Sequence, residues 1–195
     1  MHRLFVALRP PPAIRAQLIA AMGDVPHARW QDDEQLHLTL RFIGEVDRPQ
    51  AEDIAAALGQ VRGAAPEIAI AGVGRFEKGG RTDTIWAGIA PRGPLTKLHA
   101  SVDRALGQAG VAPDRRAFLP HITLARLPRG AGAEPAIDRF LAERADLASG
   151  PFTIDAMILF ASRLGREGAR YEAIARYPLD TAPKCDETNE PTVTR

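Results

Sequence analysis

A short pattern that occurs twice restricts the folds open to this chain. The pattern His-apolar-Thr-Leu stands at residues 37–40 (HLTL) and again at residues 121–124 (HITL). Each copy lies in the same predicted series: strand, proline-rich turn, helix, polar loop, motif strand, helix, strand. A unit of this length that occurs only twice is too long for a solenoid and indicates two related lobes. We therefore predict an α+β fold of two pseudo-symmetric lobes from an internal duplication, with antiparallel sheets lining a central cleft and helices outside.

Hydrophobic periodicity and turn residues give the predicted element boundaries. The predicted helices span residues 13–22, 50–61, 95–106 and 135–147, and the predicted strands span 4–8, 37–43, 68–76, 84–89, 121–127, 152–160 and 170–177. Together they form one bilobal domain over residues 1–180, with lobe repeats at about 3–77 and 84–178 and exchange of strands between them left open. Residues 181–195 have Val193 as their one large apolar residue, so they are predicted to be a disordered tail.

Composition narrows the class of protein. Hydrophobic residues make up 45% of the 195 residues, enough to bury a core without a disulfide or metal. With 25 Lys+Arg against 24 Asp+Glu, the charge balance disfavours non-specific coating of nucleic acid but allows a local basic groove. The lone Cys185 and the lack of an apolar run near the roughly 20 residues of a membrane span predict a cytoplasmic protein without a membrane anchor. We also predict a monomer.

The repeated motif places its polar residues on one face of each strand. Because alternate side chains of a strand share a face, His37 and Thr39 point one way, and Leu38 and Leu40 point into the core. The motif at residues 121–124 does the same with His121 and Thr123. One such pair alone is typical of the polar face of any sheet. Core packing gives no reason to keep a histidine and a threonine in both copies, so two His–Thr pairs are predicted to line the cleft.

Two facing imidazoles suit the hydrolysis of a phosphodiester. One histidine takes a proton from water, and the other gives a proton to the leaving alkoxide. Imidazoles titrate near pH ~6.5, so the pair can supply one base and one acid near neutral pH. Threonine hydroxyls can donate to the non-bridging phosphate oxygens. Zinc normally takes three or four protein ligands, and no suitable spacing of His or Cys is found, so neither metal nor cofactor is predicted.

The chain resembles the bacterial RNA 2′,3′-cyclic phosphodiesterases, also called 2′-5′ RNA ligases, of the two-histidine phosphoesterase superfamily. The resemblance spans nearly all of residues 3–179, and its segments are RLFVAL near the start, HLTLRFIGEV from residue 37, TIWAGI from 84, PHITLARL from 120 and RYEAIARYPL from 170. It implies metal-independent opening of RNA 2′,3′-cyclic phosphate ends to 2′-phosphomonoesters. It also implies weak reversible 2′-5′ ligation, and RNA or oligonucleotide 3′ ends as partners.

The resemblance also implies roles for individual residues. His37 would be the general acid and His121 the general base, with Thr39 and Thr123 on the phosphate; pseudo-symmetry leaves the order of acid and base open. Phe42 and Arg126 would clasp the terminal base, and each follows its histidine at the same odd offset. An odd offset points to the face opposite the histidines on a regular strand, so each strand must end, twist or bulge first. Phe42 as a core aromatic and Arg126 as a surface arginine stay open.

Other functions share the same motifs. The substrate could instead be ADP-ribose 1″,2″-cyclic phosphate or a 2′-5′ oligonucleotide, or the protein could be a non-catalytic module that binds RNA ends. Four further residues receive structural interpretations: Trp86 is expected in the core, His99 as a surface or partly buried structural histidine of a helix, and Arg115 and Arg116 as solvated loop charges that could touch phosphate.

Overall fold

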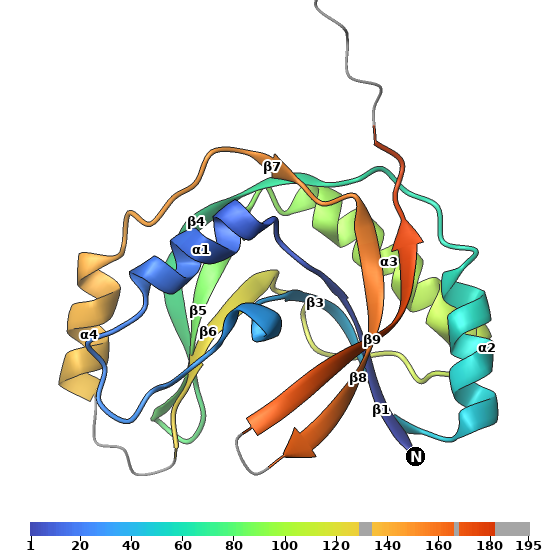
Figure 1. Cartoon of the computed structure of the whole chain (residues 1–195), viewed down its shortest axis with the longest axis horizontal. Helices are drawn as coiled ribbons and strands as arrows, with labels where there is room; N and C mark the ends of the chain where they lie inside the picture. The colour runs from blue at the N-terminus through green and yellow to red at the C-terminus, as the bar shows by residue number, and fades with distance from the viewer. Residues whose placement is uncertain (129–133, 166–167, 182–195) are drawn as a thin grey trace, which may run out of the picture.

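The fold is α+β, as predicted: helices cover a curled antiparallel sheet. A computed structural model describes residues 1–128, 134–165 and 168–181 (Figure 1). The helices are α1 (Pro12–Ala21), α2 (Arg48–Leu58), α3 (Gly93–Gln108) and α4 (Glu134–Glu143), with a short 3-10 helix η1 (Asp33–Gln35). The strands are β1 (His2–Leu8), β2 (Arg29–Trp30), β3 (Leu38–Val46), β4 (Glu67–Glu77), β5 (Thr82–Ala90), β6 (His121–Arg126), β7 (Phe152–Thr153), β8 (Ala156–Gly165) and β9 (Gly168–Pro178). No helix in the described ranges is long and apolar enough to cross a membrane.

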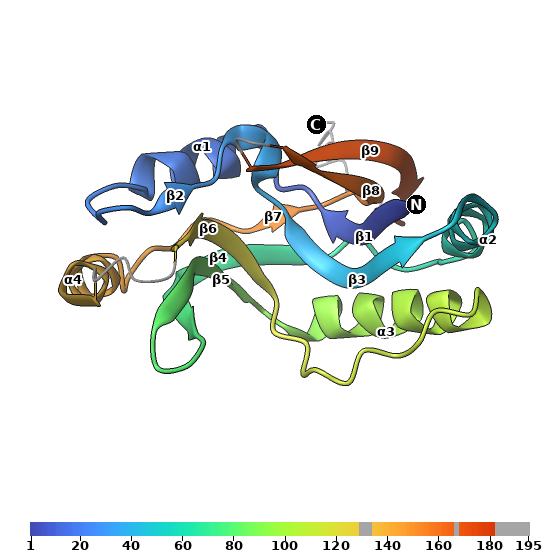
Figure 2. The same cartoon turned by 90° about the horizontal axis from the view of Figure 1, so that it is seen from below.

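The order of the strands gives the sheet its pseudo-twofold symmetry. The order is β7-β4-β5-β6-β3-β1-β8-β9, and β2 adds to β6. The two motif strands meet at the centre through a single pair, Leu38 opposite Ile122. Strand β4 pairs with β5, and β8 from late in the chain pairs with β1. Figure 2 shows β4, β5 and β6 on one side and β3, β1, β8 and β9 on the other. Each half of the sheet therefore contains a strand that the other half of the sequence supplies.

Local sequence explains where several elements begin. Proline stands in the first turn of α1, α2 and α3, where its missing N–H costs no hydrogen bond. The Asp47 carboxylate accepts from the backbone N–H of Gln50, so α2 begins at Arg48, two residues before the predicted start. Asp32 and Gln35 form a capping box around η1, inside the polar loop predicted between the helix at residues 13–22 and the strand at residues 37–43, and this loop also contains β2.

The strand predicted over residues 152–160 is wrong in one respect, because the segment forms two strands. Phe152–Thr153 pairs with β4, and Ala156–Gly165 pairs with β1 and β9. Between them the backbone leaves the ladder: the Ile154 N–H donates to the carbonyl of Pro66, and the Asp155 carbonyl accepts from Leu179 N–H. The predicted tail lies almost wholly in residues 182–195, outside the described residues.

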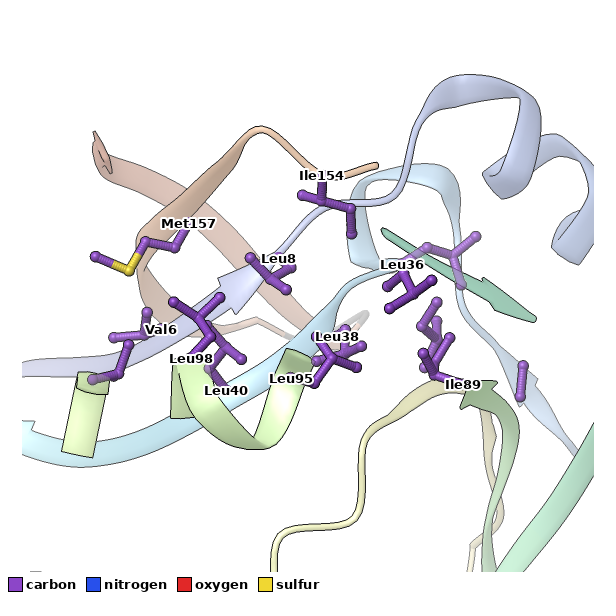
Figure 3. Close-up of a cluster of buried hydrophobic side chains, with 14 of the residues drawn as sticks. Val6, Leu8, Leu36, Leu38, Leu40, Ile89, Leu95, Leu98, Ile154 and Met157 are labelled. Carbon is purple, nitrogen blue, oxygen red and sulfur yellow. The ribbon is translucent and has the colours of Figure 1, made fainter. Parts of the chain in front are cut away.

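Two apolar clusters lie on opposite faces of the sheet. The main core packs Leu38 and Leu40 of the first motif against Leu95 and Leu98 of α3 (Figure 3). A smaller cluster on the other face contains Phe5, Ala7, Ile158 and Phe160, with Tyr171 packed against it. Strand β1 is therefore buried on both faces, which explains its unbroken apolar run. The smaller cluster forms the floor on which the site is built.

Candidate active site

Matching hydrogen bonds orient the two motif histidines. His37 Nδ1 lies 2.6 Å from the carbonyl oxygen of Gln35, and His121 Nδ1 lies 2.8 Å from that of Leu119. In each case the acceptor is the carbonyl two residues before the histidine. A carbonyl oxygen only accepts, so Nδ1 carries the proton in both rings. The Nε2 atom of each neutral ring is then the one with a free lone pair, which suits both histidines to exchange a proton there.

Each imidazole stands against an aromatic ring at right angles to it. Tyr171 of β9 meets His37 with a centroid distance of 5.0 Å and an interplanar angle of 81°. Phe76 of β4 meets His121 at 4.9 Å and 87°. Phe5 adds a second contact to His37, with centroids 5.0 Å apart. These contacts bury the rings and limit their rotation on both sides of the pseudo-twofold axis.

Trp86 belongs to the site face rather than to the core, which corrects its sequence interpretation. The indole ring packs beside His121 at a centroid distance of 6.2 Å and beside Phe76 at 5.5 Å. It lies across Gly74 of the neighbouring strand, where any Cβ would collide with the ring. Glycine at residue 74 is therefore needed so that the indole can lie flat against the sheet next to His121.

Burial favours the neutral form of both histidines by lowering their pKa values. It lowers the pKa of His37 to about 4; the carbonyl of Gln35 opposes this effect, and the positive charges of Arg126, His121 and Arg9 add to it. Burial also lowers the pKa of His121, again opposed by a backbone carbonyl and reinforced by Arg126. Arg126 thus acts on both imidazoles, which places the three groups within electrostatic range of one another. A bound anion would favour the protonated imidazole and raise these pKa values.

Two equivalent β-bulges resolve the odd offset of Phe42 and Arg126. The pairing of β1 with β3 skips Leu40, and the pairing of β5 with β6 skips Leu124. Leu40 and Leu124 occupy the same position in the two motifs, and each is followed by a second buried residue. The alternation is therefore shifted by one residue, and Phe42 and Arg126 return to the face of the histidines.

A cavity of about 510 Å³ gathers several of the predicted residues. Its lining includes Thr39, Phe42, His121 and Arg126, and it continues to Arg116 and other residues of the segment before β6. Phe42 is 37% exposed and so is no core residue. Arg3 lies over its ring, 5.2 Å from the centroid. In the described part of the chain, two predicted site residues, His37 and Thr123, are not part of this lining. His37 packs on the aromatic rings of Phe5, Phe160 and Tyr171. Thr123 lies opposite Trp86 on the neighbouring strand.

Arg126 is held at the cavity by a neighbouring strand. Its Nη1 donates to the Thr84 hydroxyl at 3.2 Å, and Thr84 is itself almost fully buried. His99 stacks on Phe118 at 4.2 Å, half-buried at the end of the cavity toward α3. Arg116 also lines the cavity, but its guanidinium binds Asp114 and lowers the pKa of that carboxyl. In the described ranges no group of three or more His, Cys, Asp or Glu side chains is arranged to hold a metal ion.

Arg41 is a residue of the site region that sequence reasoning missed. Its side chain is 5% exposed, and its guanidinium binds Asp103 of α3 at 2.7 Å and Asp114 at 3.4 Å. It also donates to the carbonyls of Phe42 and Ala112. Arg41 thus ties β3 to the segment that leads to His121. The comparison of the two motifs contained a signal for this role. Arg41 occupies the position at which the second motif has Ala125, and that position is buried.

Comparison with known proteins identifies the family of this chain. The family model described as the 2′-5′ RNA ligase superfamily matches residues 10–166. An RNA 2′,3′-cyclic phosphodiesterase of Aeropyrum pernix is 35% identical over 144 residues, which cover 73% of this chain and 81% of that protein. The Escherichia coli RNA 2′,3′-cyclic phosphodiesterase is 29% identical over 183 residues, covering 91% and 97%. The crystal structure of E. coli LigT complexed with NADP+ superposes with a TM-score of 0.70 at 26% identity, covering 91% and 97%. The two-histidine motifs, the fold and the matched family together establish that this chain belongs to the 2′-5′ RNA ligase superfamily.

Proposed function

We propose that this protein hydrolyses RNA 2′,3′-cyclic phosphate ends to 2′-phosphomonoesters without a metal ion, with His37 and His121 as its acid–base pair. The observation that carries the proposal is the matched pair of Nδ1 hydrogen bonds, which leaves Nε2 of both rings available for proton transfer. The relatives named RNA 2′,3′-cyclic phosphodiesterase support the same substrate. The complex of a structural relative with NADP+ supports a nucleotide as the ligand.

The chemistry follows from one neutral and one protonated imidazole. His121 Nε2 takes a proton from water, and the water oxygen attacks phosphorus in line with the bond to the ribose 3′ oxygen. That bond breaks as His37 gives its Nε2 proton to the 3′ oxygen, leaving a 2′-phosphate and a 3′-hydroxyl. The phosphate anion favours the protonated form of His37 on binding. The same steps with a 5′-hydroxyl in place of water as the nucleophile form a 2′-5′ phosphodiester, which is 2′-5′ ligation, and their reverse cleaves that bond.

The remaining site residues bind the substrate. Thr39 and Thr123 donate to the non-bridging oxygens, where charge grows in the transition state. Phe42 and Arg126 hold the terminal base between an aromatic face and a guanidinium, a form of stacking that tolerates any base. The bulges at Leu40 and Leu124 support this role, because they turn both side chains toward the histidine face.

Product analysis tests the proposal directly. The purified protein, in EDTA, is incubated with a short RNA that ends in a 2′,3′-cyclic phosphate, and the product is identified by phosphorus NMR. We expect a 2′-phosphomonoester to form without added metal. An intact cyclic end would overturn the substrate, and ADP-ribose 1″,2″-cyclic phosphate and 2′-5′ oligonucleotides would then be assayed in the same way. Tight binding of RNA without turnover of any of these substrates would indicate a non-catalytic module that binds RNA ends.

The rate should be highest at mildly acidic pH. The active form has one imidazolium and one neutral imidazole, so it is populated between the two histidine pKa values and is lost as pH rises above the higher one. Burial lowers the pKa of His37 to about 4 and also lowers that of His121, so both lie below the ordinary ~6.5. We expect kcat/KM for a cyclic mononucleotide to be maximal below pH ~6.5 and to fall toward pH ~8. An optimum in the alkaline range would contradict this reading of the site.

A further inference from the structure

A row of side chains crosses the sheet beside the cleft and ends at Arg29. The paired residues run from Phe76 of β4 to Thr84 of β5, then to Arg126 of β6 and Arg29 of β2. Residues opposite each other on neighbouring strands project from the same face of a sheet. Since Phe76, Thr84 and Arg126 line the cavity, Arg29 extends from the same face as the catalytic groups.

The next row confirms which face Arg29 occupies. Ile85, Ala125 and Trp30 are paired in the same order across β5, β6 and β2. Ile85 and Ala125 are fully buried in the core, and Trp30 packs on Phe140 of α4 with ring centroids 5.3 Å apart. Successive residues of a strand point to opposite faces, so Arg29 points away from the core and toward the cleft side.

Arg29 and Arg126 place two positive charges side by side, and neither has an acidic partner among the residues that the structure describes. Like charges directly opposite on neighbouring strands repel each other. Neither guanidinium forms an ion pair within the described part of the chain, and Arg29 is exposed with no side-chain hydrogen bond there. The nearby Asp32 carboxylate is occupied by the Gln35 backbone N–H at 2.9 Å. By contrast, Arg9, Arg15 and Arg75 each bind a carboxylate.

We propose that Arg29 binds the phosphate on the 5′ side of the terminal nucleotide, so that the enzyme prefers RNA chains over cyclic mononucleotides. The inference rests on the proposed function, which puts the terminal nucleotide against Arg126. Neighbouring strands lie about 4.8 Å apart, so Arg29 stands one strand beyond Arg126 along the path of a nucleotide chain that leaves the cleft. The next backbone phosphate relieves the repulsion between the two guanidinium groups. A guanidinium fork is well suited to a phosphate oxygen pair.

Two substrates with the same reacting end separate this subsite from the catalytic centre. One is uridine 2′,3′-cyclic phosphate, and the other is a trinucleotide that ends in the same cyclic uridine. We expect Arg29→Gln to lower kcat/KM for the trinucleotide by about tenfold and to leave the mononucleotide value unchanged within about twofold. In a plot of log kcat/KM against log salt concentration, the slope for the trinucleotide should become shallower by about 1, which corresponds to the loss of one phosphate contact. Arg104→Gln, on the exposed side of α3, is the matched control and should change neither value.

The outcomes distinguish failure of the subsite from failure of the function. Equal loss on both substrates, or no loss on either, would overturn the role of Arg29 and leave the proposed function intact. Failure of the unsubstituted protein to open either substrate would instead overturn the proposed function. Equilibrium binding of the same trinucleotide and mononucleotide carrying a 2′-phosphate tests the subsite without turnover. In this binding experiment we expect Arg29→Gln to weaken the binding of the trinucleotide and not that of the mononucleotide. Equal affinities of Arg29→Gln and the unsubstituted protein for the trinucleotide would contradict the subsite.

Discussion

Alanine at His37 or at His121 is expected to lower kcat on an RNA 2′,3′-cyclic phosphate end by about 10²–10⁴-fold, because each change removes one of two proton-transfer groups. The double variant should be little slower than either single variant, since a base without its acid already contributes little. Each single variant should also lose one limb of the pH–rate profile. Single-turnover assays of cyclic-end opening from about pH 4 to about pH 9 measure both effects.

The control for this experiment is His2→Ala, which removes an exposed histidine from β1. It should keep the full rate and both limbs of the profile. If alanine at His37 or His121 left the rate within a few-fold of the unsubstituted value, the acid–base assignment would be wrong, even if the protein still opened the cyclic phosphate. Circular dichroism of each variant should match that of the parent, because neither histidine belongs to the main core.

Replacement of Arg41 by methionine is expected to lower the free energy of unfolding by about 3 kcal/mol. The buried guanidinium neutralises Asp103 and Asp114 and donates to the carbonyls of Phe42 and Ala112. Methionine fills similar space but leaves Asp103 and the two carbonyls without the guanidinium donor, while Asp114 keeps its ion pair with Arg116. Breaking a buried ion pair in this way costs about 3–5 kcal/mol. The partial exposure of Asp103 and Asp114 places the loss at the lower end. Urea unfolding followed by circular dichroism measures it.

An exposed ion pair supplies the comparison. Arg48 binds Glu52 on the surface of α2, with 84% of its side chain exposed. Arg48→Met should therefore cost less than about 0.5 kcal/mol. Arg41→Lys should fall between the two, because lysine keeps the charge but cannot reach all four partners of the planar fork. A loss below about 1 kcal/mol for Arg41→Met would show that Arg41 does not hold β3 to the segment before His121.

Much of the fold and part of the site could be predicted from sequence because the signals were local and repeated. Leu38 and Leu40 face the core as strict alternation requires, and His37 and His121 occupy equivalent places because the whole unit occurs twice. The odd offset of Phe42 even required an irregularity before it, and a bulge stands there. These features follow from the alternation of side chains along a strand, and this alternation can be recognised in the sequence alone.

Features that depend on distant partners could not be predicted in the same way. The break at Ile154 and Asp155 arises because the backbone there bonds to Pro66 and Leu179 rather than to a strand. Trp86 looked like a core residue because its contacts with Gly74, Phe76 and His121, which lie on other strands, are what show the face that it occupies. The role of Arg41 needed the position of α3. In each case the deciding contact joins residues far apart in the chain, and apolar or charged character alone does not specify it.

The pairing of β8 with β1 has a consequence for the order in which the protein becomes competent during synthesis. Strand β1 is synthesised before the other strands and finds β3 early, but its partner on the other edge begins only at Ala156, so this second contact closes a very long loop. The aromatic floor under His37 needs Phe160 and Tyr171 as well as Phe5. The His121 side, where β4, β5 and β6 follow closely in sequence, can form earlier. A nascent chain therefore leaves one edge of β1, and the face that carries Phe5, uncovered until late in translation, and the half of the site around His37 matures last.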